Sequence, residues 1–180
     1  MLDKGLVQIY TGEGKGKTTA ALGLAIRAAG RNNKVLFYQF LKPECFETGE
    51  RLALEAHTLH IHVRCAGQNW DMQRSFRDSQ VMEQTRGEIH QALTEIAEFA
   101  ARRQYDVIIL DEIIFCISKG LAKFKDVKKI IDSRNPAVEI VMTGRDASAE
   151  LIEKADLVTE MKLIKHPFDR GISARKGIEY

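Results

Sequence analysis

A glycine-rich loop between a strand and a helix constrains this chain more than any other feature of its sequence. Residues 6–10 are apolar and β-branched, which predicts a buried strand, and residues 17–29 predict a helix capped near Gly30. The connection from Thr11 to Thr18 carries glycine at every second position from 12 to 16. Such glycines let successive N–H groups turn toward one point, and the following helix adds the positive end of its dipole. The order strand, loop, helix therefore predicts a phosphate-binding loop (P-loop).

The end of this loop matches the usual pattern G-x-x-x-x-G-K-[ST], whereas its start departs from it. Gly16, Lys17 and Thr18 stand in the expected places, but Thr11 replaces the first glycine, with Gly12 beside it. We expect Lys17 to neutralise phosphate charge and the Thr18 hydroxyl to bind a magnesium ion. A glycine-rich turn without a ligand is the alternative interpretation, and the order of the neighbouring elements favours the P-loop.

Strands and helices alternate along the rest of the chain. Strands are predicted at residues 35–40, 59–63, 107–110, 138–142 and 157–161, and helices at 50–56, 73–103, 113–132 and 147–154. The long helix has an apolar stripe with spacings of three, four and seven: Met82, Ile89, Leu93, Ile96 and Ala100. The alternation predicts an α/β fold, a P-loop (RecA-like) three-layer domain with a mostly parallel central sheet. We expect a single domain over residues 1–180.

Two adjacent carboxylates, Asp111 and Glu112, follow the apolar strand at 107–110. Carboxylates at the end of a buried strand are costly unless they meet a cation or hydrogen-bond donors. Magnesium bound to a triphosphate is such a cation, held in P-loop proteins by an acidic residue from a neighbouring strand. The alternative is that the two residues only begin the next helix, where negative charge is favourable.

Composition narrows the class of protein. The 27 basic and 25 acidic residues give a net charge of +2, which argues against a dominant nucleic-acid-binding surface. Cys45, Cys65 and Cys116 form no C-x-x-C pair, so reduced thiols in a cytoplasmic protein fit best. No apolar run approaches the roughly 20 residues that a membrane span requires. We therefore expect neither nucleic acid nor membrane as a partner.

The C-terminal segment, about residues 165–180, is too apolar and too rich in glycine for a solvated tail. We expect it to dock back on the domain near the site. Its residues leave two roles open, a lid over the site or a strap that only packs.

Four segments match those of one known family. They are residues 10–21, which contain the P-loop, Leu110-Asp111-Glu112, Thr143-Gly144-Arg145, and the tail at 165–172 and 176–180. In these segments the chain resembles the ATP:corrinoid adenosyltransferases, which act on cob(I)alamin and its precursors. Thr11 in place of the first loop glycine looks like this family's own form of the loop.

The resemblance implies transfer of the 5′-deoxyadenosyl group of ATP to the cobalt of a reduced corrinoid, with release of triphosphate. ATP is thought to lie reversed in the loop in this family. The resemblance gives catalytic roles to Lys17, Thr18 and Glu112, and magnesium binding to Thr18, Asp111 and Glu112. Contacts to ATP and corrinoid are expected at Gly12, Glu13, Gly14, Lys15, Gly16, Lys17, Thr18, Thr19, Trp70 and Arg145.

The segment around Trp70 departs from the family. An aromatic pair there is associated with crowding the lower face of the corrinoid, but this chain has Gln68 where the second aromatic is expected. How the lower cobalt ligand is displaced is therefore left open. The resemblance also implies an electron-donating reductase as a partner, and a homodimer is plausible.

Two other functions remain as alternatives at this stage. A nucleoside kinase on a P-loop domain would need a base near its acceptor hydroxyl. A RecA-like ATPase that binds single-stranded nucleic acid would need a basic groove with stacking aromatics, which the weak net charge and 7% aromatic content disfavour.

Overall fold

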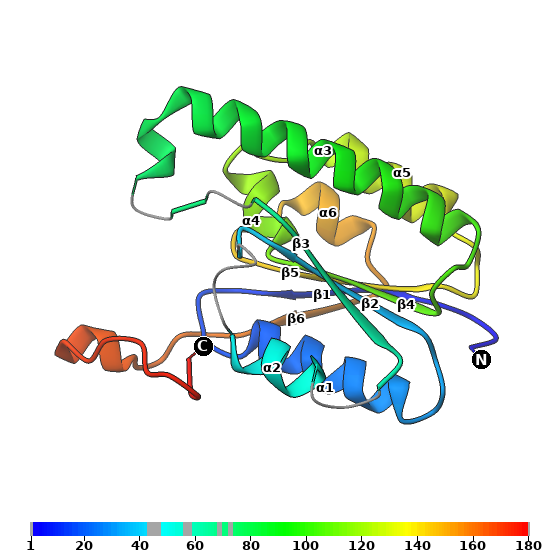
Figure 1. Ribbon diagram of the computed structural model, residues 1–180, viewed down its shortest axis with the longest axis horizontal. Coiled ribbons are helices and arrows are strands. Elements are labelled where there is room, and N and C mark those ends of the chain that lie inside the picture. The colour runs from blue at the N-terminus through cyan, green and yellow to red at the C-terminus, as the bar shows by residue number, and fades with distance from the viewer. Residues whose placement is uncertain (1, 43–47, 56–58, 68–69, 72–73, 180) are drawn as a thin grey trace.

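Six parallel strands form one sheet in the computed structural model of the protein, in the order β3-β2-β4-β5-β1-β6 (Figure 1). The structure describes residues 2–42, 48–55, 59–67, 70–71 and 74–179. The strands are β1 (Val7–Thr11), β2 (Val35–Phe40), β3 (Ile61–Ala66), β4 (Val107–Asp111), β5 (Glu139–Thr143) and β6 (Leu157–Glu160). The predicted parallel sheet is confirmed.

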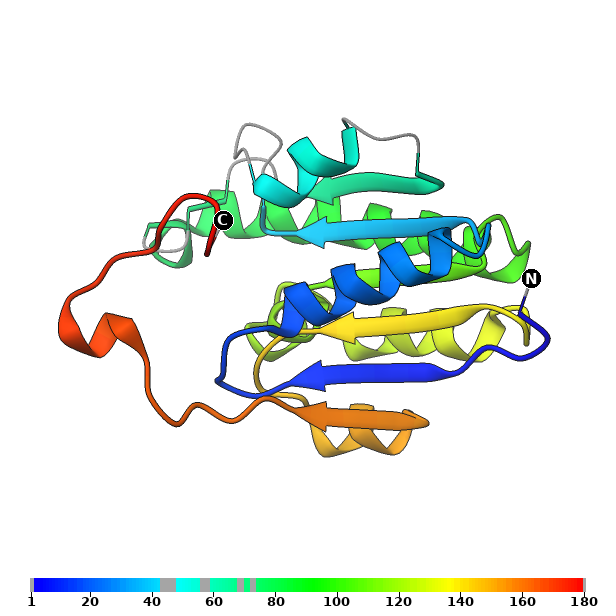
Figure 2. The ribbon, with the colours of Figure 1, turned by 90° about the horizontal axis from the view of Figure 1, so that it is seen from below.

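Helices cover both faces of this sheet (Figures 1 and 2). One face carries α1 (Lys17–Ala29) and α2 (Gly49–Glu55). The other carries α3 (Ser79–Ala101), α4 (Ile113–Ser118), α5 (Phe124–Ser133) and α6 (Ala149–Glu153). Short 3₁₀ turns lie at η1 (Ser75–Arg77) and η2 (Pro167–Arg170). The predicted three-layer architecture is confirmed, and none of the helices in the described ranges is long and apolar enough to cross a membrane.

Two cores flank the sheet, and the strands alternate between them. In β4, Ile108 and Leu110 belong to the core beneath α3 and α5, whereas Val107 and Ile109 belong to the core beneath α1. A strand buried on both faces reads as a continuous apolar run, as this one does. The stripe predicted on the long helix faces the first core: Ile89, Leu93, Ile96 and Ala100 are buried, and Met82 packs at its edge.

The start predicted for the long helix was wrong, and two other helix ends show how they are formed. The helix predicted at 73–103 begins at Ser79, because the Asp78 carboxylate caps it by accepting the N–H groups of residues 80 and 81. The helical segments predicted at 113–132 are the two helices α4 and α5, and Gly120 between them has φ 68°. Gly30 does end α1, but in right-handed conformation, and Asn32 makes the left-handed turn instead.

All six carboxyl ends lie at one edge of the sheet, as the arrowheads in Figure 2 show. This edge brings together the P-loop after β1, residues 41 and 42 after β2, Glu112 after β4 and the loop after β5. The sequence predicted that the carboxylates lie on a strand next to the P-loop strand. This was wrong, because β1 and β4 are not neighbours. β5 lies between them and pairs with both. A residue of β5 is therefore placed to connect the two halves of the site.

Candidate active site

The P-loop lies directly against the chain that leaves β6. The Gly14 N–H donates to the Met161 carbonyl at 2.6 Å. A Cβ atom on Gly12 or Gly14 would stand 2.6 Å from the same carbonyl oxygen, and Gly12 also has φ +96°. These two glycines are thus required by the close approach of residues 161–162, and the Gly14 amide does not point into the predicted anion nest.

Lys17 folds back into the loop that precedes it. Its buried ammonium donates to the carbonyls of Gly12 at 2.6 Å and Gly14 at 2.7 Å. Burial lowers the pKa of Lys17, and the neighbouring Glu112 partly opposes that shift. The loop therefore keeps a cation at its centre in the absence of phosphate.

Asp111 is the hub of the site and is completely buried. Its Oδ1 accepts hydrogen bonds from the hydroxyls of Thr18 at 2.9 Å and Thr143 at 2.7 Å. Its Oδ2 forms an ion pair with the Lys42 ammonium at 2.8 Å. This one carboxylate thereby joins α1, β2 and β5 to the end of β4.

Glu112 is held in a conformation unusual for its residue type. Its φ is 66°, in the left-handed region, and its N–H donates to the Thr143 hydroxyl at 2.9 Å. Burial raises the pKa of Glu112, and the Asp111 charge raises it further. No hydrogen bond or ion pair to its carboxylate occurs within the described part of the chain. A half-buried carboxylate without such a partner is a position suited to a cation.

These donors fit a magnesium ion bound together with a nucleotide. Across the described residues no group of three or more His, Cys, Asp or Glu side chains could hold a metal by itself. Magnesium usually takes one or two carboxylates, keeps waters and shares phosphate oxygens, so Asp111, Glu112 and Thr18 suffice. The chemistry of the donor set therefore fits magnesium, and the magnesium site stays a prediction.

Further predicted contacts lie around the rim. Glu13 of the P-loop and Arg145, which follows β5, form an ion pair at 2.9 Å and are each about half exposed. Gly144 must be glycine there, because a Cβ would stand 2.6 Å from the Phe115 nitrogen, and its φ is +138°. The two charged side chains are thus open to a ligand.

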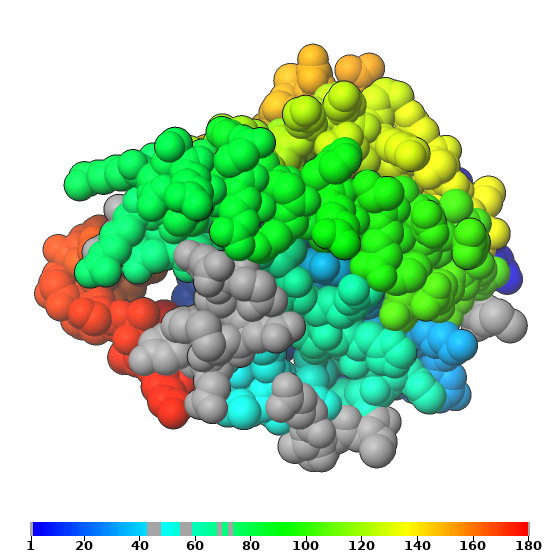
Figure 3. Space-filling model, turned by 45° about the horizontal axis from the view of Figure 1, so that its top comes forward, coloured from blue at the N-terminus to red at the C-terminus, as the bar shows by residue number. Residues whose placement is uncertain are grey.

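The tail reaches the P-loop only at its end. Lys15 donates to the Ile178 carbonyl at 2.9 Å and forms an ion pair with Glu179 at 3.1 Å. Between β6 and this contact the tail stands away from the body, with an opening beneath it in Figure 3. Its apolar side chains Ile164 and Phe168 are 89% and 71% exposed.

A cavity of about 240 Å³ lies between the P-loop helix and this returning tail. It is lined by Thr18, Thr19, Leu22, Lys42, Gly49, Glu50 and residues 177–179. The predicted residue Thr19 thus borders open space beside the metal-binding group, as a nucleotide contact would require.

Trp70 is a buried residue at the same end of the sheet, 6% exposed. Phe76 stands edge-on to it, with ring centroids 4.9 Å apart, and is 40% exposed. The indole Nε1 has no hydrogen-bond partner within the described ranges. The nearby Gln68, which replaces the expected aromatic, lies outside the described residues. Phe76 is therefore an exposed aromatic beside Trp70, and sequence reasoning missed it.

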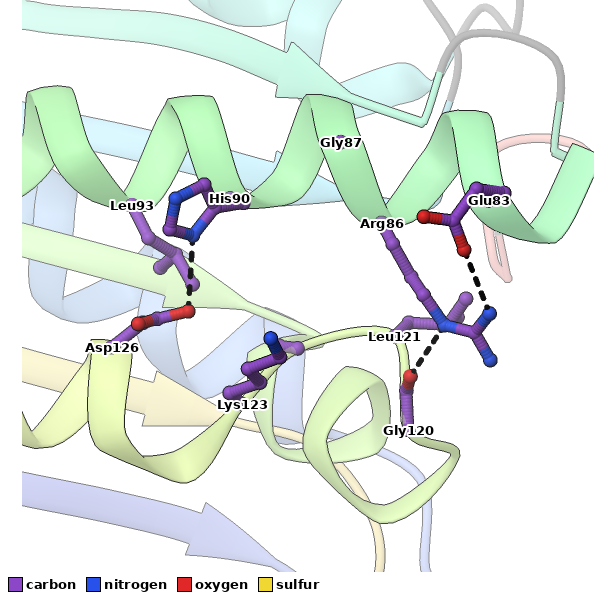
Figure 4. Close-up of a pocket in the computed structure, with 10 residues that line it drawn as sticks. Glu83, Arg86, Gly87, His90, Leu93, Gly120, Leu121, Lys123 and Asp126 are labelled. Atoms are coloured by element: carbon purple, nitrogen blue, oxygen red, sulfur yellow. Dashed lines mark hydrogen bonds and ion pairs between the residues drawn. The ribbon is translucent and has the colours of Figure 1, made fainter.

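A second hollow, about 290 Å³, lies between α3 and the turn from α4 to α5 (Figure 4). Glu83, Arg86, His90 and Asp126 are engaged with one another or with the backbone. His90 meets Asp126 at 3.1 Å, and Arg86 donates to the Gly120 carbonyl at 2.9 Å and pairs with Glu83. This hollow contains none of the predicted site residues.

Comparison with known proteins identifies the family of the chain. Residues 3–180 match the family described as ATP:corrinoid adenosyltransferase BtuR/CobO/CobP. This chain belongs to that family. A corrinoid adenosyltransferase of Escherichia coli strain K12 is 33% identical over 182 residues, covering 99% of this chain and 87% of the relative. One from Sinorhizobium sp is 34% identical over 182 residues, covering 99% and 81%.

Two solved structures are also similar to the chain. One is the Legionella pneumophila ATPase DotB, at TM-score 0.46 and 15% identity, covering 84% of this chain and 33% of that one. The other is domain III of the Thermotoga maritima replication initiation protein DnaA, at TM-score 0.41 and 14% identity, covering 88% and 55%.

The sequence analysis missed two polar residues of this site, Thr143 and Lys42. Thr143 lay in a segment recognised as matching, but its bonds to Asp111 and to the Glu112 N–H depend on β5 being inserted between β1 and β4. Lys42 follows an ordinary buried strand, and no pattern along the chain marks it as a partner of Asp111, 69 residues away.

Proposed function

We propose that this protein transfers the 5′-deoxyadenosyl group of ATP to the cobalt of a reduced corrinoid and releases triphosphate. The observation that carries the proposal is the near full-length match to the ATP:corrinoid adenosyltransferase family. The site supports it independently, because Thr18 of the P-loop and the unpaired Glu112 carboxylate meet around Asp111.

The reaction is a substitution at the ribose 5′ carbon. The electron pair of cobalt(I) forms the cobalt–carbon bond, the bond from C5′ to its oxygen breaks, and the bonding pair leaves on the triphosphate. Cobalt is formally oxidised from I to III, so no further oxidant is needed. Because cobalt(I) is itself a strong nucleophile, the protein mainly positions the reactants and stabilises charge on the leaving oxygen.

The described residues divide this work. The P-loop amides that remain free and Lys17 would bind the triphosphate, with Lys17 leaving the carbonyls of residues 12 and 14. Thr18, Asp111 and Glu112 would hold magnesium, which when bound neutralises triphosphate charge. Glu112 acts as a ligand in this scheme and not as a general base. Arg145 and Glu13, paired at 2.9 Å on the open rim, are placed to contact substrate.

Other parts of the proposal rest on family membership. They are corrinoid binding at the Trp70 end of the sheet and a reductase that supplies the electrons. A homodimer is also part of the proposal, as is a cytoplasmic location, since Cys45, Cys65 and Cys116 form no C-x-x-C pair and fit reduced thiols. The half-exposed Phe76 beside Trp70 gives the corrinoid an aromatic surface there.

Product analysis tests the proposal directly. Purified protein is incubated with magnesium ATP and chemically reduced cobalamin, and in a parallel reaction with reduced cobinamide. We expect triphosphate and a light-sensitive adenosyl-corrinoid in equal amounts, and neither product from Lys17→Met. ADP and phosphate with an unchanged corrinoid spectrum would overturn the proposal in favour of a kinase or an ATPase.

A further inference from the structure

Lys42 is a second lysine at the centre of this site. Its ammonium lies 2.8 Å from Asp111 Oδ2 and 3.9 Å from Glu50, and its side chain is 23% exposed. Thr18 donates to the other oxygen of the same Asp111 carboxylate. Lys42 therefore occupies a coordination position on a residue to which the proposed function gives a magnesium ion.

The backbone at Lys42 is constrained to place it there. The preceding residue, Leu41, has φ 60°, and Gly67 packs so closely that an added Cβ would stand 3.3 Å from Leu41. A buried guanidinium fixes the other side, since Arg51 donates to the Lys42 carbonyl at 2.7 Å and to Gln39 at 2.7 Å. Left-handed conformation at a non-glycine residue persists only where its surroundings enforce it, and it is concentrated at functional positions.

The charges around Lys42 make it a mobile counter-ion. Asp111 and Glu112 bring two adjacent carboxylates, and Lys42 is the cation that forms an ion pair with one of them. The same ammonium borders the cavity of about 240 Å³ that Thr18 and Thr19 also line. A short rotation of a flexible stem thus connects the carboxylate to the space beside the P-loop.

We propose that Lys42 is a second phosphate-binding lysine, which neutralises Asp111 in the metal-free protein and moves its ammonium to the triphosphate once a divalent cation engages Asp111. This inference rests on the proposed function for the identity of the leaving group. Lys42, which follows β2, would then be a second cation for the departing triphosphate, in addition to Lys17 from the P-loop. Retreat of the ammonium to Glu50, which already lies 3.9 Å away, is the competing outcome.

The test uses two probes that bind without ATP or corrinoid. Manganese alone, followed by electron paramagnetic resonance, reports competition for Asp111. Inorganic tripolyphosphate with magnesium, followed by titration calorimetry, reports the contact to the leaving group. In Lys42→Met we expect manganese to bind more tightly, by about tenfold, because a competing cation is gone. We expect tripolyphosphate to bind about ten- to a hundredfold more weakly, the range of a charge-assisted hydrogen bond.

Opposite shifts for the two probes distinguish this role from a structural one, since a damaged site would bind both more weakly. Lys42→Arg keeps the charge and should restore part of the tripolyphosphate affinity. Lys128→Met removes the lysine of the Lys128–Asp132 ion pair on α5 and should leave both affinities unchanged.

Unchanged tripolyphosphate affinity in Lys42→Met would mean that the Lys42 ammonium moves to Glu50 and not to the triphosphate. Unchanged or weaker manganese binding would mean that the Lys42 ammonium does not compete with a cation for Asp111. Either result overturns the inference. A wild-type protein that forms no adenosyl-corrinoid would instead refute the proposed function, and the two binding measurements would still stand.

Discussion

At the scale of single residues, Thr143 couples the two carboxylates of the site. Its hydroxyl donates to Asp111 and accepts the Glu112 N–H, which holds Glu112 in its left-handed conformation. Thr143→Val keeps the shape, removes one of the three groups that bind Asp111 and leaves the Glu112 N–H without its acceptor, so we expect a loss of about 1–3 kcal/mol in the free energy of unfolding. Adenosyl transfer should fall at least tenfold. Urea unfolding and initial rates measure the two effects, and Thr143→Ser should retain most of both; equal losses in the two variants would contradict the hydroxyl's role.

Glu112 should oppose folding when no metal is bound. Its pKa is raised by burial and by Asp111, so the folded state binds its proton more tightly than the unfolded state does. The free energy of unfolding therefore falls as pH rises from near its ordinary value of 4.5 through the raised pKa. In EDTA, Glu112→Gln should remove this part of the pH dependence and stabilise the protein at neutral pH by about 1 kcal/mol. Parallel urea titrations from pH 4 to pH 8 test it, and a destabilised Gln variant would contradict it.

At the scale of elements, the P-loop depends on the segment that leaves β6. Gly14→Ala would place a methyl group 2.6 Å from the Met161 carbonyl and 2.9 Å from the Lys162 carbonyl. Backbone must shift, so we expect ATP affinity to fall about tenfold or more, the result of displacing a binding group by a fraction of an ångström. Gly23→Ala on α1 is the matched control, since nothing lies within 4 Å of its added methyl. It should bind ATP normally and gain about 0.5–1 kcal/mol in stability. Calorimetry with ATP measures both.

The same elements show how far the sequence alone could reach. The alternation of apolar runs with helical stripes predicted the parallel sheet, and the loop at 11–18 predicted the site at its carboxyl edge. Strand order did not follow, because the insertion of β5 between β1 and β4 depends on contacts far apart in the chain. For that reason Thr143 and Lys42 were missed, since each acquires its role only by standing beside Asp111.

At the scale of the whole molecule, the C-terminal tail differs from the rest of the chain because exposed contacts, and not a buried core, connect it to the domain. It leaves the sheet after β6, exposes Phe168 and Ile172, and rejoins the chain through Lys15. That exposed ion pair is screened by salt. Removing residues 165–180 should therefore leave the urea midpoint and ATP affinity nearly unchanged. If the exposed apolar side chains close over the corrinoid, the same truncation should also raise the KM for corrinoid about tenfold or more. This is the effect expected when two or three apolar side chains no longer contact the substrate.

The two roles left open for the tail predict different results for this truncation. A packing strap would lower the urea midpoint and leave the KM for corrinoid unchanged in the protein that remains folded, whereas a lid would do the reverse. At saturating ATP, Lys15→Met separates the ion pair from the apolar side chains, because it removes the contact to Glu179 and Ile178 and leaves those side chains in place. If the lid is held by that contact, Lys15→Met and high salt should each reproduce part of the rise in KM. A full rise on truncation with no effect of Lys15→Met would place the closing force in the apolar side chains, whose burial against a large macrocycle needs no ion pair.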